Sequence, residues 1–167
     1  MINKINKLSK SEFIKVFANI FENASWIAEK LYDQKPFRGY KELSSKMIDI
    51  FETSPKERKL EILNAHPDLG DKTKISSLTP DSKKEQNSAG LDQCTEDEFN
   101  EFKKLNDAYK KFGFPFILAI KGKNRNEILN NFRKRVASKP EIEFNEAIKQ
   151  VKKIPSLRLE DLNNKNI

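Results

Sequence analysis

The sequence predicts an all-α protein, a single domain of about eight helices that spans residues 1–167. Apolar residues recur every three or four positions along most of the chain, which is the spacing of one helix face. Residues that cap helix N-termini precede these apolar segments, in several cases with a glutamate three positions later. Only 37% of the residues are hydrophobic, but twelve phenylalanines supply bulky side chains for a core, so the composition excludes a disordered chain.

Three helices are predicted in the first part of the chain. The first begins behind Ser9, which forms a capping box with a glutamate three residues later, and its apolar stripe continues to Leu31. The second covers residues 43–51. The third begins at residues 54–57, where a cap precedes a proline, and it must end near His66, because a residue before a proline avoids the α region.

Four further helices begin behind residues that cap an N-terminus: Thr79, Thr95, Asn124 and Ser138. The last of these helices is broken by Pro155, and a short helix over residues 157–162 closes the chain. Residues 114–120, FPFILAI, form an apolar run that is too short for a typical helix. This run is either a buried extended segment or the first turn of a helix.

One helix face differs from the others, and it follows shortly after the only histidine of the chain, His66. Offsets of three, four and seven place four side chains on one face of the helix that begins at Pro80: Ser82, Glu85, Gln86 and Ala89. Apolar residues occupy the corresponding face of the other helices. A polar stripe in this position indicates either a satisfied hydrogen-bond network or a binding site, and we favour a site.

The distribution of charge and the lack of targeting signals in the sequence disfavour several classes of function. The formal charge is +7, but basic and acidic residues are interleaved along the whole chain, which favours a solvated surface over a nucleic-acid interface. A positive field would still attract a small anion. One cysteine, Cys94, excludes an internal disulfide. No stretch has the apolar length of a signal peptide or a membrane span, and the ending NNKNI contains no peroxisomal address, so we expect a cytoplasmic protein.

His66 is the residue best suited to acid–base chemistry, because an imidazole titrates close to neutral pH. A metal site is disfavoured, since the chain has one histidine and one cysteine. A nucleophilic triad is disfavoured as well, because no serine lies in a recognisable strained turn. If Glu85 accepts a hydrogen bond from one ring nitrogen of His66, it selects the tautomer of the imidazole. Taken singly, each of these residues is also compatible with a structural role.

Two other polar residues lie within apolar patterns. Arg158 stands between leucines near the C-terminus. It either pairs with a surface acidic side chain or binds a substrate carboxylate through the two prongs of its guanidinium group. Asn106 lies on an apolar helix stripe, and we interpret it as a buried hydrogen-bonding residue.

Several of these segments occur together and in a fixed order: His66-Pro67-Asp68-Leu69, Ser82-x-x-Glu85-Gln86 with Ala89-Gly90-Leu91, Leu105-Asn106 to Tyr109, Phe112 to Ile117, and Lys153-Ile154 to Leu157-Arg158-Leu159. In this combination the chain resembles the OHCU decarboxylase family along nearly its whole length. The resemblance implies an all-α, cofactor-free and usually homodimeric enzyme. It also implies decarboxylation of 2-oxo-4-hydroxy-4-carboxy-5-ureidoimidazoline to (S)-allantoin in urate breakdown.

The resemblance also assigns roles to particular residues. His66 matches the catalytic histidine of the family, and Glu85 matches its catalytic carboxylate. Six residues match substrate-binding positions: Pro67, Ser82, Gln86, Phe116, Ile117 and Arg158. The chain departs from the family pattern at Gly70 and Asp71, where Ala-Gly is common, but these positions lie outside the catalytic set.

Two rival functions stay open. A basic helical module that binds nucleic acid or protein would show an affinity that falls steeply with salt and does not depend on His66. A cofactor-free hydrolase of a neighbouring ureide would use the same acid–base pair, but it would open a ring instead of releasing CO2.

Overall fold

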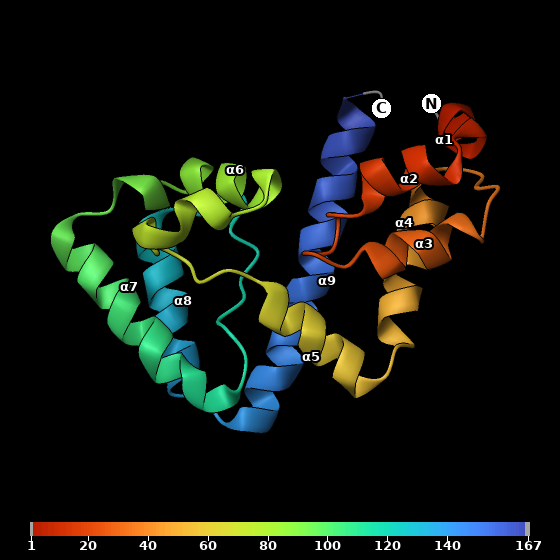
Figure 1. Cartoon of the computed structure of the whole chain (residues 1–167). Helices are drawn as coiled ribbons and strands as arrows, with labels where there is room; N and C mark the ends of the chain where they lie inside the picture. Colours follow the sequence, from red (N-terminus) through yellow and green to blue (C-terminus); the bar gives the residue numbers. More distant parts are fainter. Residues whose placement is uncertain (1, 166–167) are drawn as a thin grey trace. The chain divides into compact units, whose positions relative to one another are not determined.

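The computed structural model describes residues 2–165, except for the side chains of Lys72 and Ile75. The described residues form nine α-helices and three short 3₁₀ helices and no strand, so the predicted all-α class is confirmed (Figure 1). The α-helices are α1 (Ile2–Lys7), α2 (Lys10–Phe17), α3 (Ser25–Tyr32), α4 (Tyr40–Glu52), α5 (Lys56–Ala65), α6 (Pro80–Ser88), α7 (Glu96–Tyr109), α8 (Arg125–Val136) and α9 (Pro140–Asn164). The 3₁₀ helices are η1 (Lys72–Ser77), η2 (Leu91–Gln93) and η3 (Lys110–Phe112). None of the described helices has the length and apolar character needed to cross a membrane.

The predicted caps account for the starts of several helices. Reciprocal capping boxes are present at three N-termini: Ser9 for α2, Thr95 for α7 and Asn124 for α8. Thr79 caps α6, because its hydroxyl oxygen accepts a hydrogen bond from the backbone N–H of Ser82 at 3.3 Å. Each cap satisfies a backbone N–H that the helix leaves unbonded and contributes about 1 kcal/mol to stability. These local interactions explain why the sequence predicts these helix starts well.

The described residues fall into two compact units, so the single domain over residues 1–167 stays a prediction. The first unit comprises the chain up to Ile62 together with the chain from Lys152 onward, and the second comprises Leu63–Val151. In the first unit α2 packs against α3, and α3 packs against α4. The core of this unit consists of fully or nearly fully buried apolar side chains, among them Phe13, Phe17, Phe21, Ile27, Leu31, Leu43 and Phe51.

The structure divides the first predicted helix into α2 and α3, so the prediction of one helix is wrong. Turns occupy residues 18–24, where Asn23 has a φ of 50°, in the left-handed region. Nη1 of Arg158 donates hydrogen bonds to the carbonyl oxygens of Asn19 and Ile20, at 2.8 and 3.5 Å. This side chain replaces the helical partners that these carbonyls would otherwise need. Ile20, Phe21 and Ala24 in the turns are buried, as they would be on a helix, so their spacing does not reveal the break.

The predicted break at Pro155 is also wrong, because α9 continues through this residue to Asn164. A proline inside a helix removes one hydrogen bond and costs about 3 kcal/mol or more. Tertiary contacts of the following turn offset this cost. Pro155 is buried, Leu159 is only 2% exposed, and Arg158 forms an ion pair with Glu22 of the same unit. The packing of the chain therefore overrides the local preference of proline.

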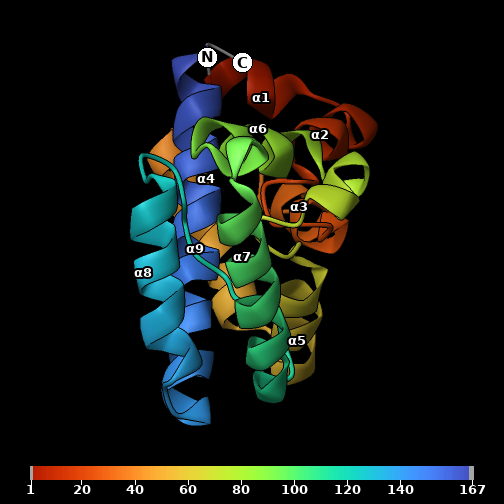
Figure 2. The ribbon, with the colours of Figure 1, turned by 90° about the vertical axis from the view of Figure 1, so that its left-hand side faces the viewer.

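The second unit contains α6, α7, α8 and the first part of α9, and α7 packs against α8. Residues 114–120 run between α7 and α8 as a non-helical segment (Figure 2), and six of these seven residues are buried. Of the two predicted alternatives, the buried extended segment is therefore correct. Side chains supply two of its hydrogen bonds: the Ala119 N–H donates to Oε1 of Gln150 at 3.0 Å, and the Ile117 carbonyl accepts from Arg135 at 2.6 Å.

Candidate active site

His66 lies directly after α5, and its backbone N–H donates to the carbonyl oxygen of Leu63 at 3.3 Å. The predicted position at a helix terminus is therefore confirmed. His66 and Pro67, both half-buried, line an open pocket with a volume of about 570 Å³. Other lining residues come from the last turn of α7 and the segment that follows it, including Asn106 and Phe114. A pocket of this size accommodates a small molecule.

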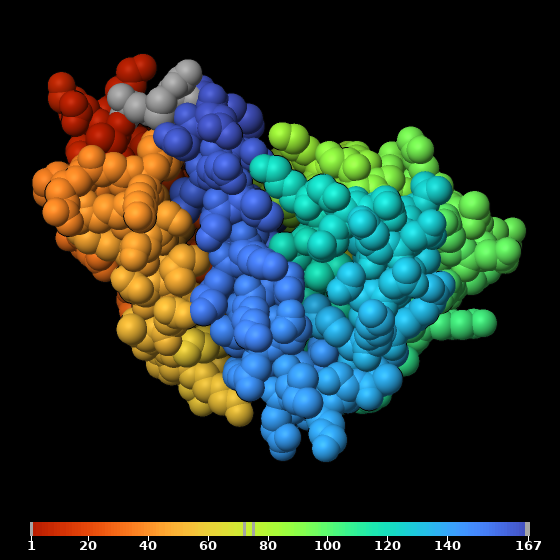
Figure 3. Space-filling view, turned by 180° about the vertical axis from the view of Figure 1, so that it is seen from behind, coloured from red at the N-terminus to blue at the C-terminus, as the bar shows by residue number. Residues whose placement is uncertain are grey.

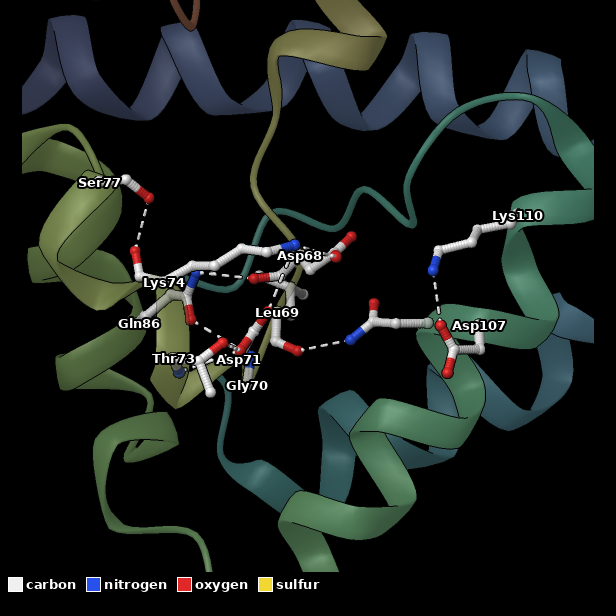
Figure 4. A network of polar contacts seen from close by, with 11 residues as sticks. Asp68, Leu69, Gly70, Asp71, Thr73, Lys74, Ser77, Gln86, Asp107 and Lys110 are labelled. Atoms are coloured by element: carbon white, nitrogen blue, oxygen red, sulfur yellow. Dashed lines mark hydrogen bonds and ion pairs between the residues drawn. The ribbon is translucent and has the colours of Figure 1, made fainter.

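Two buried amide side chains hold the loop that follows the histidine (Figure 4). Gln86 of α6 accepts a hydrogen bond from the Gly70 N–H through Oε1 and donates to the Asp68 carbonyl through Nε2, both at 3.3 Å. Asn106 of α7 donates through Nδ2 to the Leu69 carbonyl at 3.0 Å. The interpretation of Asn106 as a buried hydrogen-bonding residue is confirmed. The loop is thus fixed from two helices at three consecutive residues.

The polar face of α6 lies where the spacing predicts it. Ser82, Gln86 and Ala89 are buried, and Glu85 is half-buried on the same side of the helix. Through Gln86 this face is bonded directly to the loop beside the pocket. The structure therefore bonds the α6 face to the segment after His66, whereas the predicted hydrogen bond between Glu85 and His66 stays a prediction.

Gly70 allows this loop to pass close to α7. Its φ of +71° lies in the left-handed region, and a Cβ atom built on it would meet Cγ of Phe102 at 2.6 Å. Phe102 is fully buried and cannot move away cheaply. Both the backbone conformation and the contact therefore require glycine at this position.

We expect Gly70→Ala to lower the free energy of unfolding by at least about 1 kcal/mol more than Gly122→Ala does. Gly122 is a matched control, because its φ of +78° is similar but a Cβ atom there meets nothing within 4 Å. The difference between the variants therefore isolates the clash with Phe102. Urea denaturation followed by circular dichroism measures both values, and equal losses would show that the contact is unimportant.

An alternating set of charges borders the loop and the pocket. Nζ of Lys74 lies 3.3 Å from Oδ2 of Asp68 and 3.4 Å from Oδ2 of Asp71. Attraction to Asp68 raises the pKa of Lys74. Burial alone would raise the pKa of Asp71, but hydrogen bonds from Thr73 and Lys74 outweigh this effect and lower the pKa. On the α7 side Lys110 pairs with Asp107 at 2.6 Å, so the lysines that line the pocket are each balanced by a carboxylate.

The segment after α7 contributes to the pocket through residues other than those matched by resemblance. Phe114 and Pro115 line the pocket. Phe116 is 1% exposed and stacks on Phe132 with a centroid distance of 3.9 Å. Ile117 is also buried, and its carbonyl accepts a hydrogen bond from α8. Phe116 and Ile117 therefore pack behind the residues that line the pocket. A contact of their backbone with substrate stays a prediction.

Arg158 belongs to the first unit and is 5% exposed. Its Nη1 lies 3.0 Å from Oε2 of Glu22, whose side chain is 2% exposed. Arg158 therefore forms an ion pair, but the predicted surface location of its partner is wrong, because the Glu22 carboxylate is buried. The role as a substrate clamp stays a prediction.

Several residues of the pocket have no counterpart among the predicted site residues. Asn106 lines the pocket, and its Oδ1 is buried without a hydrogen-bond partner among the described residues, which is rare for an amide oxygen. Its place on an apolar stripe is the one signal that could have pointed to the site. Lys74, Lys110 and Phe114 are spaced like ordinary surface or core residues, so no local pattern marks them.

Comparisons with known proteins extend this picture. The sequence model of the OHCU decarboxylase family matches residues 6–160. The chain is 38% identical over 162 residues to the uric acid degradation bifunctional protein of Bacillus sp. (strain TB-90), covering 96% of this chain but only 32% of that protein. It is 36% identical over 159 residues to the 2-oxo-4-hydroxy-4-carboxy-5-ureidoimidazoline decarboxylase of Haloferax volcanii, covering 95% of this chain and 93% of that protein.

A solved structure shares the fold. The crystal structure of an OHCU decarboxylase in the presence of (S)-allantoin superposes with a TM-score of 0.71 at 26% sequence identity, covering 88% of this chain and 96% of that chain. The similarity therefore includes both the sequence and the arrangement of the helices.

Proposed function

The chain belongs to the OHCU decarboxylase family of carboxy-lyases, and on this premise we propose that it decarboxylates 2-oxo-4-hydroxy-4-carboxy-5-ureidoimidazoline to (S)-allantoin in urate degradation. We further propose that His66 is the general acid/base and that Glu85 orients it. The observation that carries the proposal is the pocket of about 570 Å³ beside His66 and Pro67, in a chain that matches named decarboxylases along nearly its whole length.

The chemistry of the substrate agrees with this residue set. The carboxylate is attached to a ring carbon next to a C=N bond, so the electron pair of the breaking C–C bond moves into the ring as CO2 leaves. The ureido-bearing carbon must then receive a proton on one face to give a single enantiomer. An imidazole in the pocket wall can deliver that proton, because it exchanges protons near neutral pH.

The remaining matched residues would bind and orient the substrate. Ser82 and Gln86 belong to the polar face of α6, and Pro67 lines the pocket. The ureido group offers several N–H donors and one carbonyl acceptor, and the ring adds a second carbonyl, which suits amide and hydroxyl side chains. Binding at several points would hold the ring in one orientation toward His66, as a stereospecific protonation requires.

The proposal is tested with substrate generated freshly from urate and labelled with ¹³C in its carboxylate. We expect the purified protein to release ¹³CO2 and to form optically active (S)-allantoin. Racemic allantoin at the uncatalysed rate would overturn the proposal. A ring-opened product that keeps the label would instead support the rival hydrolase.

The resemblance also predicts a homodimer, and this stays a prediction. Sedimentation equilibrium of the purified protein distinguishes a dimer from a monomer of 19.4 kDa.

A further inference from the structure

Three helices of the second unit bring a buried polar cluster together behind the pocket wall: Tyr109 of α7, Arg135 of α8 and Glu143 of α9. Their exposed fractions are 0%, 9% and 1%. Burying an ion pair in this way is costly, and replacing such a pair by apolar residues is often neutral or stabilising. The stability of the core therefore does not by itself explain this cluster.

The cluster holds the guanidinium group of Arg135 in one orientation. Nε lies 3.2 and 3.1 Å from the two carboxylate oxygens of Glu143, and Nη2 lies 3.0 Å from Oε2. The hydroxyl of Tyr109 donates to the same carboxylate. Burial and this hydrogen bond raise the pKa of the Tyr109 hydroxyl, so the phenol stays a neutral donor. Glu143 thus fixes the Nε and Nη2 atoms of the guanidinium group.

The remaining nitrogen of the Arg135 guanidinium group, Nη1, contacts the segment that follows α7. Nη1 donates to the Ile117 carbonyl at 2.6 Å, and the guanidinium carbon lies 4.6 Å from the ring centroid of Phe116. Phe116 in turn stacks on Phe132 of α8, with an angle of 10° between the rings. Arg135 therefore holds two consecutive residues of a segment that lacks helical or strand hydrogen bonds, one through the backbone and one through the side chain.

We propose that Arg135 is a positioning residue for catalysis, which orients the segment carrying Phe114 and Pro115 in the wall of the His66 pocket. The inference rests on the proposed function. A peptide group is planar, so fixing the Ile117 carbonyl also fixes the direction of the next N–H in the segment. Lysine cannot substitute for arginine here, because a compact ammonium group cannot bridge the Glu143 carboxylate and the Ile117 carbonyl in the way that the planar fork does.

The test compares three purified variants in the decarboxylation assay. Arg135→Lys keeps the charge and loses the bridge, and we expect kcat/KM to fall about 10- to 100-fold, since small displacements in an active site have effects of this size. The enantiomeric purity of the allantoin should fall as well, because the uncatalysed reaction then competes. Tyr109→Phe loses two hydrogen bonds of the same cluster, the one to Glu143 and the one from Nη2 of Arg135, but keeps the bond from Arg135 to Ile117. We expect it to lower Tm and to reduce kcat/KM far less than Arg135→Lys does.

Arg133→Lys is the matched control, because it makes the same substitution two residues earlier on α8. Arg133 pairs with Glu101 at the surface, and the outer face of α8 is visible in Figure 3. We expect neither Tm nor kcat/KM to change appreciably. If the cluster acted on stability alone, Tyr109→Phe and Arg135→Lys would both lower Tm, and Arg135→Lys would keep the wild-type kcat/KM.

A folded Arg135→Lys variant with wild-type kcat/KM and optical purity would overturn the inference. If this variant does not fold, Glu143→Gln decides the question, because a neutral amide offers only one acceptor oxygen and holds the guanidinium group less firmly. We expect a smaller loss of kcat/KM in Glu143→Gln, and wild-type kinetics would overturn the inference. An inactive wild-type protein would instead refute the proposed function on which the inference rests.

Discussion

Replacing His66 with asparagine is expected to lower kcat/KM for the ureidoimidazoline about 10²- to 10⁴-fold, the range found for removal of a general acid or base. Asparagine is also polar but cannot exchange a proton near neutral pH. The residue lies at the end of α5 with a half-buried side chain, so the helices should form as before. The optical activity of allantoin formed from fresh substrate measures the loss, and far-UV circular dichroism checks the fold.

The control for this variant is Lys83→Asn, which introduces the same residue at an exposed position of α6. We expect it to behave like the wild-type protein. Formation of (S)-allantoin by His66→Asn at the wild-type rate would show that the imidazole is not the acid/base group. The Glu85 proposal would then lose its basis too, because its role is to orient that ring.

Replacing Arg158 with methionine is expected to lower the free energy of unfolding by about 3–5 kcal/mol, the usual cost of leaving one partner of a buried ion pair uncompensated. The Glu22 side chain is 2% exposed and would lose the guanidinium group 3.0 Å away. The carbonyl oxygens of Asn19 and Ile20 would lose the same donor. Urea denaturation measures the loss.

Arg38→Met is the matched control in the same unit. Its ion pair with Glu42 is largely exposed, with 91% of the Arg38 side chain accessible, so the expected loss is at most about 1 kcal/mol. The double variant Glu22→Gln/Arg158→Met should recover part of the stability, because it removes the unpaired charge. A loss in Arg158→Met no larger than that in Arg38→Met would contradict a structural role of the buried pair.

A milder change at Arg158 separates stability from substrate binding. Arg158→Lys keeps the charge but loses the two-pronged fork. If Arg158 clamps the substrate carboxylate, KM rises more than kcat falls. An unchanged KM in the folded variant would show that Arg158 does not bind the substrate and that its role is the ion pair with Glu22.

Local signals in the chain predict most of the fold. The capping boxes at Ser9, Thr95 and Asn124 are formed by residues three positions apart, so their geometry needs no distant partner. The proline after His66 ends α5 for the same local reason. The offsets of Ser82 and Gln86 likewise place them on one buried face, because the helical repeat relates residues within a few turns.

Other features depend on residues far apart in the sequence. The turns between α2 and α3 have backbone carbonyls bonded by Arg158, which follows Asn19 by 139 residues. The continuation of α9 through Pro155 likewise depends on packing after that residue, which outweighs the local cost of proline.

In the candidate site, too, some features follow from local sequence and others depend on residues far apart in the chain. Sequence patterns predict His66 and the polar face of α6 as candidates, because each is marked by its immediate neighbours. Only the tertiary structure shows that Asn106 and Gln86 hold the loop after His66, and that Arg135 bonds the Ile117 carbonyl. Hydrogen bonds to irregular backbone have no period in the sequence, so the side chains that make them become visible only once the helices are packed.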